Sequence, residues 1–245
     1  SHDHWDVLYQ NKGGTWSYVY TLEKRRKHQA KKYLKVDKFT KSYELLHKNV
    51  EKALSDKKDD MAVPMYTLLH TFMRVGNEIY YKAHGHKGLS TLQRGDIMIK
   101  GNTVRFSFLG KDGVPQSLFY DFPERYVKRL KKLLNGKKDT DFVFETDGHL
   151  LHERDFQKAF KRYCGNIFYP HIVRSYYASS RVKSVLNSVN TLSKESMQHL
   201  FLSIAHTLGH KKYDNSSGEW KDSYAVTIRS YVQPELLEEV MARVR

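Results

Sequence analysis

The sequence predicts a mainly α-helical fold with one small antiparallel β-sheet. Apolar residues recur every three or four positions in several long segments, which is the spacing of amphipathic helices. They alternate with polar residues only between about 97 and 122, where two glycine-containing turns interrupt the alternation. A chain of 245 residues with 40% hydrophobic residues, including 12 Phe and 17 Tyr, can bury a genuine core. We therefore expect one large domain, or one domain with a fragment of another.

The beginning of the chain differs in composition from the rest. Residues 5–35 are polar and basic, and they contain too few apolar side chains to build a core of their own. We therefore expect residues 1–38 to form a basic linker or the remainder of something removed. The main domain would then comprise residues 39–245.

Two helices are expected at the start of this domain. The first carries apolar residues from Phe39 to Leu54 and stops at the polar run 55–58. The second follows Pro64, is strongly apolar, and ends at or just beyond Gly76. Arg74 would lie inside this second helix, among side chains that favour burial.

The alternating region predicts three strands. Ile97 and Ile99 precede a turn at 100–102, a second alternating run covers 104–108, and a third strand at 117–122 follows the turn 110–113. The simplest arrangement is a three-stranded antiparallel meander. Lys111 would lie at a hairpin tip.

The remainder of the chain is expected to be helical almost throughout. The apolar spacing predicts helices at 127–134, 156–163, about 170–188 and 193–208. The low-complexity stretch 214–218 predicts a flexible loop.

The charge balance makes a polyanion the expected partner. The chain has 42 Lys and Arg against 27 Asp and Glu, a net charge of +15. It contains no run of the roughly 18 apolar residues that span a bilayer, and no apolar signal-peptide core, so we expect an intracellular protein without membrane contact. A single cysteine, Cys164, excludes an internal disulfide and a cysteine-clustered zinc site. The 13 histidines show no metal-binding spacing, so no metal is expected.

Five residues carry the chemistry of phosphodiester cleavage: Arg74, Lys111, Arg174, His210 and Tyr231. Two arginines, a lysine and a histidine can neutralise phosphate oxygens in the transition state, and a tyrosine hydroxyl can attack without a metal. A lysine on a hairpin tip can also protonate a departing 5′ oxygen. Each residue alone has an ordinary explanation, such as an ion pair, a solvated turn or a helix cap. The order of these five residues along the chain favours a functional explanation over the ordinary ones.

His171 adds to this set. His171 and Arg174 lie three residues apart just after Pro170, so they share one face near the start of a helix, where backbone N–H groups also favour a phosphate. The spacing by itself is common, and its specificity is weak.

Three segments resemble the core of the compact type IB DNA topoisomerases: residues 74–78, 88–92 and 104–113. They carry an arginine, a glycine-leucine-x-threonine-leucine motif and a lysine hairpin, in the order and approximate spacing of that family. The resemblance covers roughly residues 40–245 and is best at 68–113 and 225–234. Those enzymes share their catalytic fold and chemistry with the tyrosine recombinases. The resemblance therefore implies that catalytic fold for this chain.

The resemblance also implies roles. Arg74 and Arg174 would clamp the phosphate, Lys111 would be the general acid, and His210 would bond a nonbridging oxygen. Tyr231 would attack to form a 3′-phosphotyrosyl bond, so that rotation relaxes supercoils in duplex DNA without a cofactor. Further DNA contacts are expected from basic residues outside this set: Lys87, Arg105, Lys211 and Lys212. The DNA-clamping domain of that family would be absent or reduced to residues 5–35, so that residues 1–38 are a linker or a remnant of it.

Several alternatives stay open. The segment 211–224 is longer than the family's usual connection, so Tyr224 is a second candidate nucleophile. His171 is a recombinase-like feature and favours a tyrosine recombinase, which would act as a tetramer. The weakly apolar tail after Tyr231 favours a monomeric topoisomerase. A non-catalytic DNA-binding module would explain the charge alone. The expected compartment contains DNA: the cytoplasm or nucleoid, the nucleus, or a virion.

Overall fold

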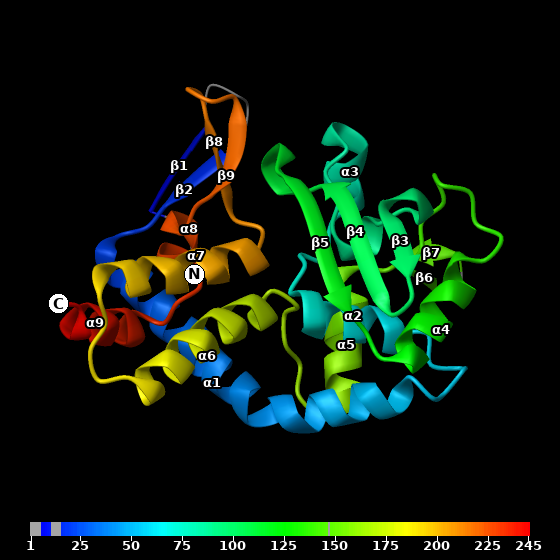
Figure 1. Ribbon diagram of the computed structural model, residues 1–245, viewed down its shortest axis with the longest axis horizontal. Coiled ribbons are helices and arrows are strands. Elements are labelled where there is room, and N and C mark those ends of the chain that lie inside the picture. The colour runs from blue at the N-terminus through cyan, green and yellow to red at the C-terminus, as the bar shows by residue number, and fades with distance from the viewer. Residues whose placement is uncertain (1–5, 11–15, 147) are drawn as a thin grey trace.

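Two apolar cores organise the chain, one on each side of a central cavity. The computed structural model describes residues 6–10, 16–146 and 148–245. The first core is built from residues between Phe39 and Val173, and the second from residues between Ala178 and Val240. Figure 1 shows the two groups side by side, with helix α1 (Leu22–Ala53) running beneath both. The expected class, mainly α with a small antiparallel sheet, is confirmed.

The first core packs helices against one face of a sheet. Its helices are α1, α2 (Ala62–Thr71), α4 (Glu124–Leu134) and α5 (Glu153–Cys164). The sheet is the expected meander of β3 (Ile97–Lys100), β4 (Thr103–Leu109) and β5 (Pro115–Asp121). Its register pairs Ile97 with Phe106 and Phe106 with Leu118, so the alternating apolar residues share the face toward the helices.

The second core is helical and lies on the other side of the cavity. It contains α6 (Ile172–Ser188), α7 (Lys194–Thr207), α8 (Ala225–Ser230) and α9 (Pro234–Arg243). The α9 helix buries Leu236 and Val240 against this core. The tail of the chain therefore packs on its own domain.

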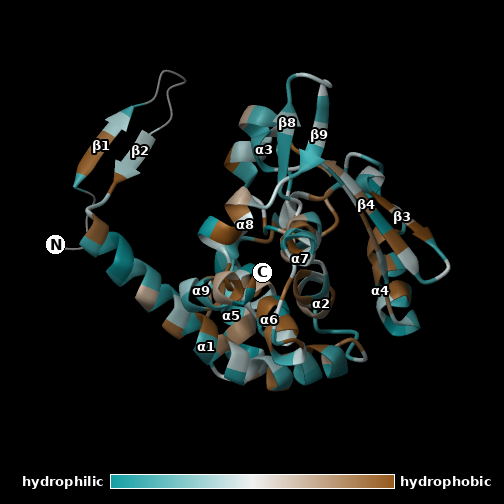
Figure 2. Cartoon of the chain, turned by 60° about the vertical axis from the view of Figure 1, so that its left-hand side comes forward, coloured by the Kyte–Doolittle hydropathy of each residue, from teal (hydrophilic) through white to brown (hydrophobic). Residues whose placement is uncertain are grey.

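Smaller elements lie outside the two cores. They are the hairpin β1 (Val7–Gln10) and β2 (Trp16–Val19), α3 (Glu78–His84), and the short pair β6 (Glu145–Thr146) and β7 (His149–Leu150). In Figure 2 the β1–β2 hairpin and the first turns of α1 project from the rest of the molecule. No helix in the described part of the chain is both long and apolar enough to cross a membrane.

Helix α1 begins at Leu22, well before the start expected at Phe39, and it crosses the boundary expected at residues 38 and 39. Thr21 caps it by accepting a hydrogen bond from the Lys24 N–H. Tyr33 and Val36 are 4% and 2% exposed and extend the apolar stripe upstream of Phe39. The segment cannot build a core alone, but it packs onto one supplied by the rest of the chain.

The segment 211–224 also differs from expectation. It forms a hairpin of β8 (Lys211–Asp214) and β9 (Glu219–Asp222), and the expected flexible loop 214–218 is its turn. The Asp214 carboxylate accepts hydrogen bonds from Ser216, and Tyr213 packs edge-on against Trp220. These local contacts order a stretch whose composition alone is typical of a loop.

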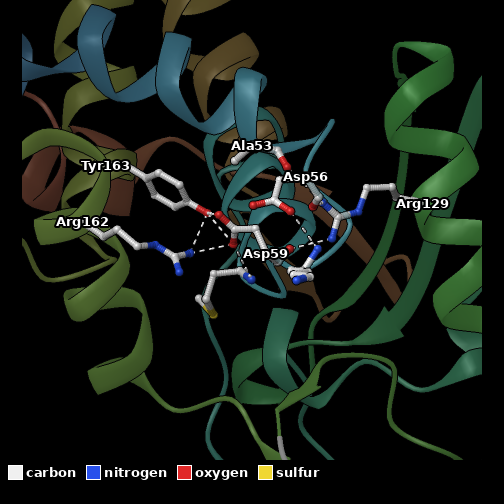
Figure 3. A network of polar contacts seen from close by, with 8 residues as sticks. Ala53, Asp56, Asp59, Arg129, Arg162 and Tyr163 are labelled. Carbon is white, nitrogen blue, oxygen red and sulfur yellow. Dashed lines mark hydrogen bonds and ion pairs between the residues drawn. The ribbon is translucent and has the colours of Figure 1, made fainter.

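A polar network fixes the turn between α1 and α2. Tyr163 donates a hydrogen bond to the Asp59 carboxylate at 2.8 Å, and Arg162 forms an ion pair with the same group at 2.6 Å (Figure 3). Arg129 of α4 donates to the carbonyl oxygens of Ala53, Asp56 and Asp59. The turn is thereby tied to both α4 and α5, which sets the direction in which α2 leads toward the cavity.

Candidate active site

A cavity of about 290 Å³ separates the two cores. Its lining comes from the segment after α2, residues 87–88, the β4–β5 hairpin, the first turn of α6, the end of α7 and the start of α8. The lining contains one acidic residue, Asp112, and a set of cations: Arg74, Lys87, Lys111, Arg174, Lys211 and Lys212. An opening with this charge balance attracts an anion.

Arg74 does not lie inside a helix, contrary to the expectation from sequence. Helix α2 ends at Thr71, and Phe72 adopts a left-handed conformation with φ 54°. Arg74 therefore sits on an extended segment that leads away from the helix. The cause is tertiary, because the Phe72 carbonyl accepts a hydrogen bond from Arg174 at 2.7 Å.

The motif at 88–92 holds the backbone of Arg74. The Leu89 N–H donates to the Arg74 carbonyl at 2.8 Å, and the Ser90 N–H donates to the Val75 carbonyl at 2.6 Å. A Cβ on Gly88 would lie 2.5 Å from the Arg74 carbonyl oxygen, so only glycine fits this approach. The half-buried guanidinium is thus carried by a rigid segment.

Arg74 and Tyr231 are in direct contact. Arg74 Nη2 donates to the Tyr231 hydroxyl oxygen at 2.8 Å. Tyr231 follows α8 and is only 2% exposed, with its ring packed against those of His171 and His210. It does not line the cavity directly. The Arg74 guanidinium therefore lies between the Tyr231 hydroxyl and the cavity.

Arg174 lies at the centre of the site, in the first turn of α6, and is 3% exposed. It donates to the Phe72 and Leu208 carbonyls and to His210 Nε2, the last two at 2.8 and 2.9 Å. Burial lowers the pKa of its guanidinium to about 10, so it remains charged at neutral pH. Its buried Nε has no hydrogen-bond partner among the described residues. A buried cation with an unused donor fits an anionic ligand.

His210 is held between Arg174 and Thr227. It follows Gly209, whose φ is +66°, at the end of α7, as expected from sequence. Since arginine can only donate, His210 Nε2 accepts from Arg174, and Nδ1–H donates to the Thr227 hydroxyl at 2.8 Å. Burial, together with the Arg174 and Arg74 cations, lowers the pKa of His210 to about 3. The imidazole is therefore neutral at pH 7 in the free protein.

Lys111 lies at the exposed tip between β4 and β5, as expected, and lines the same cavity. The base of its hairpin is tied to the His210 turn across the cavity. Gln116 Nε2 donates to the Gly209 carbonyl and Lys211 Nζ to the Pro115 carbonyl, both at 3.1 Å. These two contacts set the distance between the lysine hairpin and the histidine.

The two alternative residues have different surroundings. The ring of His171 lies 5.2 Å from that of Tyr231, so it borders the site. Tyr224 precedes α8 and packs toward Phe201 of the second core, with ring centroids 6.0 Å apart. No hydrogen bond to Arg74 or Arg174 is recorded for Tyr224 within the described residues, which favours Tyr231 as the nucleophile.

The four expected DNA contacts are placed unequally. Lys211 and Lys212 line the cavity. Lys87 lines it too, but its ammonium is paired with Asp96 at 2.8 Å, so its charge is compensated. Arg105 stacks over Phe119, on the face of the sheet opposite the core. Their roles in binding stay predictions.

Four functional candidates were not predicted from the sequence: Lys32, Tyr33, Gln116 and Thr227. Lys32 and Tyr33 reach the Tyr231 segment from α1, at sequence separations of 198 and 199 residues. Gln116 donates to the Gly209 carbonyl, next to His210, and the Thr227 hydroxyl contacts the His210 ring. No local pattern marks contacts of this range.

Comparison with known proteins gives a family and several relatives. The family model described as "Eukaryotic DNA topoisomerase I, catalytic core" matches residues 21–222. DNA topoisomerase I of Monkeypox virus and DNA topoisomerase 1B of Vaccinia virus (strain Copenhagen) are each 29% identical over 118 residues, covering 48% of this chain and 36% of the viral protein. DNA topoisomerase 1 of Rabbit fibroma virus is 26% identical over 121 residues, covering 48% and 37%. The matched part thus spans little more than a third of these relatives.

Solved structures of a recombinase also align with the chain. The pre-cleavage complex of the XerH site-specific recombinase bound to difH substrate has a TM-score of 0.43 and 14% identity, covering 95% of this chain and 59% of the recombinase. The post-cleavage complex with a palindromic difH substrate has a TM-score of 0.45 and 13% identity, covering 82% and 51%.

The family match covers well over half of the chain and holds Arg74, Lys111, Arg174 and His210, while Tyr231 lies beyond its end. The match begins at residue 21, so it also includes the whole of α1. The chain belongs to the family of the eukaryotic DNA topoisomerase I catalytic core.

Proposed function

We propose that this chain is a type IB DNA topoisomerase that nicks one strand of duplex DNA, allows rotation and then reseals the strand. The observation that carries the proposal is the contact between Arg74 and the Tyr231 hydroxyl, beside the Arg174–His210 pair. Phosphate-binding cations and a candidate nucleophile meet at one point, although they come from distant parts of the chain.

The phosphate is bound first. In our proposal the scissile phosphate enters the cavity and takes the place of the Tyr231 hydroxyl against Arg74. Arg174 offers its unpartnered Nε, and His210 donates from Nε2 to a nonbridging oxygen. This requires a proton on His210 Nε2, so the hydrogen bond from Arg174 to that nitrogen must break and the Thr227 hydroxyl must then donate to Nδ1.

The chemical step is a transesterification. The Tyr231 oxygen forms a bond to phosphorus and loses its phenolic proton to solvent, while the bond from phosphorus to the 5′ oxygen breaks. Lys111 donates a proton to that leaving oxygen. One phosphate ester replaces another, so the 3′-phosphotyrosyl bond preserves the energy needed for resealing. The reverse attack by the 5′ hydroxyl restores the strand and the tyrosine.

A tyrosine recombinase is the second candidate. The contact between the His171 and Tyr231 rings favours it, because this histidine is a recombinase-like feature. The packing of α9 favours the topoisomerase, since Leu236 and Val240 are buried in their own domain and are not offered to a neighbour. A monomer acting on duplex DNA, in a DNA-containing compartment, is therefore our preferred proposal.

Two assays test the proposal. The chain is incubated with supercoiled plasmid in buffer containing EDTA and no ATP, and with a nicked duplex whose cleaved fragment diffuses away. We expect stepwise relaxation, first order in protein, and a covalent protein–DNA band. Joined products from two labelled duplexes, with no relaxation of a lone plasmid, would establish the recombinase instead. DNA binding without any covalent protein–DNA band would instead support a non-catalytic DNA-binding module.

A further inference from the structure

The N-terminal half of α1 reaches the segment that carries Tyr231. Lys32 Nζ donates a hydrogen bond to the Ser230 carbonyl, and the Tyr33 hydroxyl donates to the Val232 carbonyl at 2.5 Å. These two carbonyls belong to the residues on either side of Tyr231. Consecutive residues of α1 thus hold the backbone immediately before and after the candidate nucleophile.

Lys32 also approaches the tyrosine ring itself. Its ammonium lies 5.6 Å from the centroid of the Tyr231 ring and 5.0 Å from that of Tyr33. Burial lowers its pKa to about 8, and no ion pair is recorded for it among the described residues. Lys32 shares the neighbourhood of the neutral His171 ring with the cations Arg74 and Arg174, and the Glu235 carboxylate acts on the adjacent Tyr33 hydroxyl. A half-buried lysine without a carboxylate ion pair is unfavourable, which together with its contacts to the Tyr231 segment points to a functional reason for its position.

Tyr33 shows that the contact is part of the packed fold. Its side chain is 4% exposed, and burial raises the pKa of its hydroxyl, so it stays a hydrogen-bond donor. Within the described residues, the hydroxyl donates to the Val232 carbonyl. The backbone after Tyr231 is therefore held by a buried side chain of α1.

Resting on the proposed function, we propose that Lys32 and Tyr33 are positioning residues for the nucleophile. They fix the backbone on both sides of Tyr231, and the Lys32 ammonium places a positive charge beside the ring, where negative charge develops during attack. The segment 22–38, expected from sequence to be a linker or a remnant of another domain, is then a working part of the active site. A variant that lacks residues 1–38 would still contain the five residues of the candidate site. We expect it to cleave poorly, because it has lost Lys32 and Tyr33.

The test separates binding from cleavage. Lys32→Met, Lys32→Arg, Tyr33→Phe and the control Lys41→Met are compared in single-turnover cleavage of the nicked duplex at saturating protein. Lys41 is an exposed lysine on the same helix, so its substitution removes the same charge without touching the Tyr231 segment. Non-covalent affinity is measured separately for each substitution combined with Tyr231→Phe.

We expect Lys32→Met to slow cleavage on the order of 10- to 100-fold with little change in affinity, because the lost cation acts mainly during attack. Lys32→Arg should restore much of the rate. Tyr33→Phe should slow cleavage about fivefold, the effect of one lost hydrogen bond. Lys41→Met should cleave at the wild-type rate. Replacing the bridging 5′ oxygen with sulfur should leave the Lys32→Met defect in place, because that defect is on the nucleophile side.

The outcomes are distinguishable. No covalent band from the wild type would refute the proposed function itself. Wild-type cleavage by both Lys32→Met and Tyr33→Phe, or a Lys32→Met defect found only in affinity, would overturn the positioning role alone. Rescue of Lys32→Met by the sulfur substrate would also overturn it, since Lys32 would then serve the leaving group. If Lys32→Met does not fold, Lys32→Arg and Tyr33→Phe still decide.

Discussion

Arg74 donates a hydrogen bond to the hydroxyl of Tyr231, 2.8 Å away, although the two residues are 157 positions apart. The tyrosine is 2% exposed, so in the free protein this arginine covers the hydroxyl from the cavity side. A phosphate bound by Arg74 would break that contact and release the hydroxyl beside the phosphorus atom. In the proposed mechanism, substrate binding and exposure of the nucleophile are thereby coupled.

Tyr231→Phe should abolish the covalent adduct while leaving DNA affinity nearly intact, because only the attacking oxygen is lost. The matched control is Tyr224→Phe, which removes a hydroxyl seven residues earlier and should leave cleavage unchanged. Adducts are trapped on the nicked duplex and mapped by peptide mass. An adduct found on Tyr224 would refute the assignment of the nucleophile.

Lys111→Ala should slow cleavage by about 10²–10⁴, the usual contribution of a general acid. A substrate with sulfur in place of the bridging 5′ oxygen should restore most of that loss, because a thiolate leaves without a proton. Lys100→Ala, an exposed lysine at the far end of the same sheet, serves as the control. If sulfur gives no rescue, Lys111 acts in binding and another group protonates the leaving oxygen.

Gln116→Ala should slow cleavage about fivefold, because one hydrogen bond that holds the lysine hairpin to the Gly209 carbonyl is lost. The defect should be smaller on the sulfur substrate, since the hairpin matters only through the proton of Lys111. Equal defects on both substrates would show that Gln116 affects the site by another route. The measurement is again single-turnover cleavage at saturating protein.

The sheet could be predicted from sequence because its signals are local. Alternation of apolar residues and the turns at 100–102 and 110–113 specify a meander, and the observed register places Ile97 opposite Phe106. The place of His210 at the end of a helix could be predicted for the same reason, because the preceding residue, Gly209, marks the helix end. In each case the informative residues lie within a few positions of the feature that they determine.

The start of α1 and the end of α2 could not be predicted in this way. Tyr33 donates a hydrogen bond to the Val232 carbonyl, 199 residues later, and no local sequence pattern near residue 33 predicts that partner. Helix α2 ends at Thr71 because the next residue, Phe72, turns its carbonyl toward Arg174, 102 residues away. The local pattern alone would start α1 at Phe39 and continue α2 to about Gly76, and tertiary contacts move both boundaries.

The pH dependence of stability should report the burial of His210. Its pKa is about 3 in the folded protein and near 6.5 when unfolded. Between these values the unfolded chain binds a proton that the folded protein does not, so the free energy of unfolding falls as the pH falls from 6.5 toward 3. Above pH 6.5 the histidine contributes no slope. Denaturant unfolding at pH 7.5 and pH 5 should therefore show a smaller loss for His210→Gln than for the wild type, and equal losses would contradict the depressed pKa.

Salt dependence should show which cations meet the DNA. Each phosphate neutralised on duplex DNA contributes about −0.9 to the slope of log affinity against log salt. Lys212 is exposed and lines the cavity, so Lys212→Ala should make that slope shallower by about one unit. Lys132→Ala, an exposed lysine on α4 that does not line the cavity, should leave the slope unchanged. The affinities are measured with Tyr231→Phe, so that no covalent step contributes. A nearly flat response in the parent protein, or equal slopes for the two lysine variants, would mean that the duplex does not lie along the cavity between the two cores.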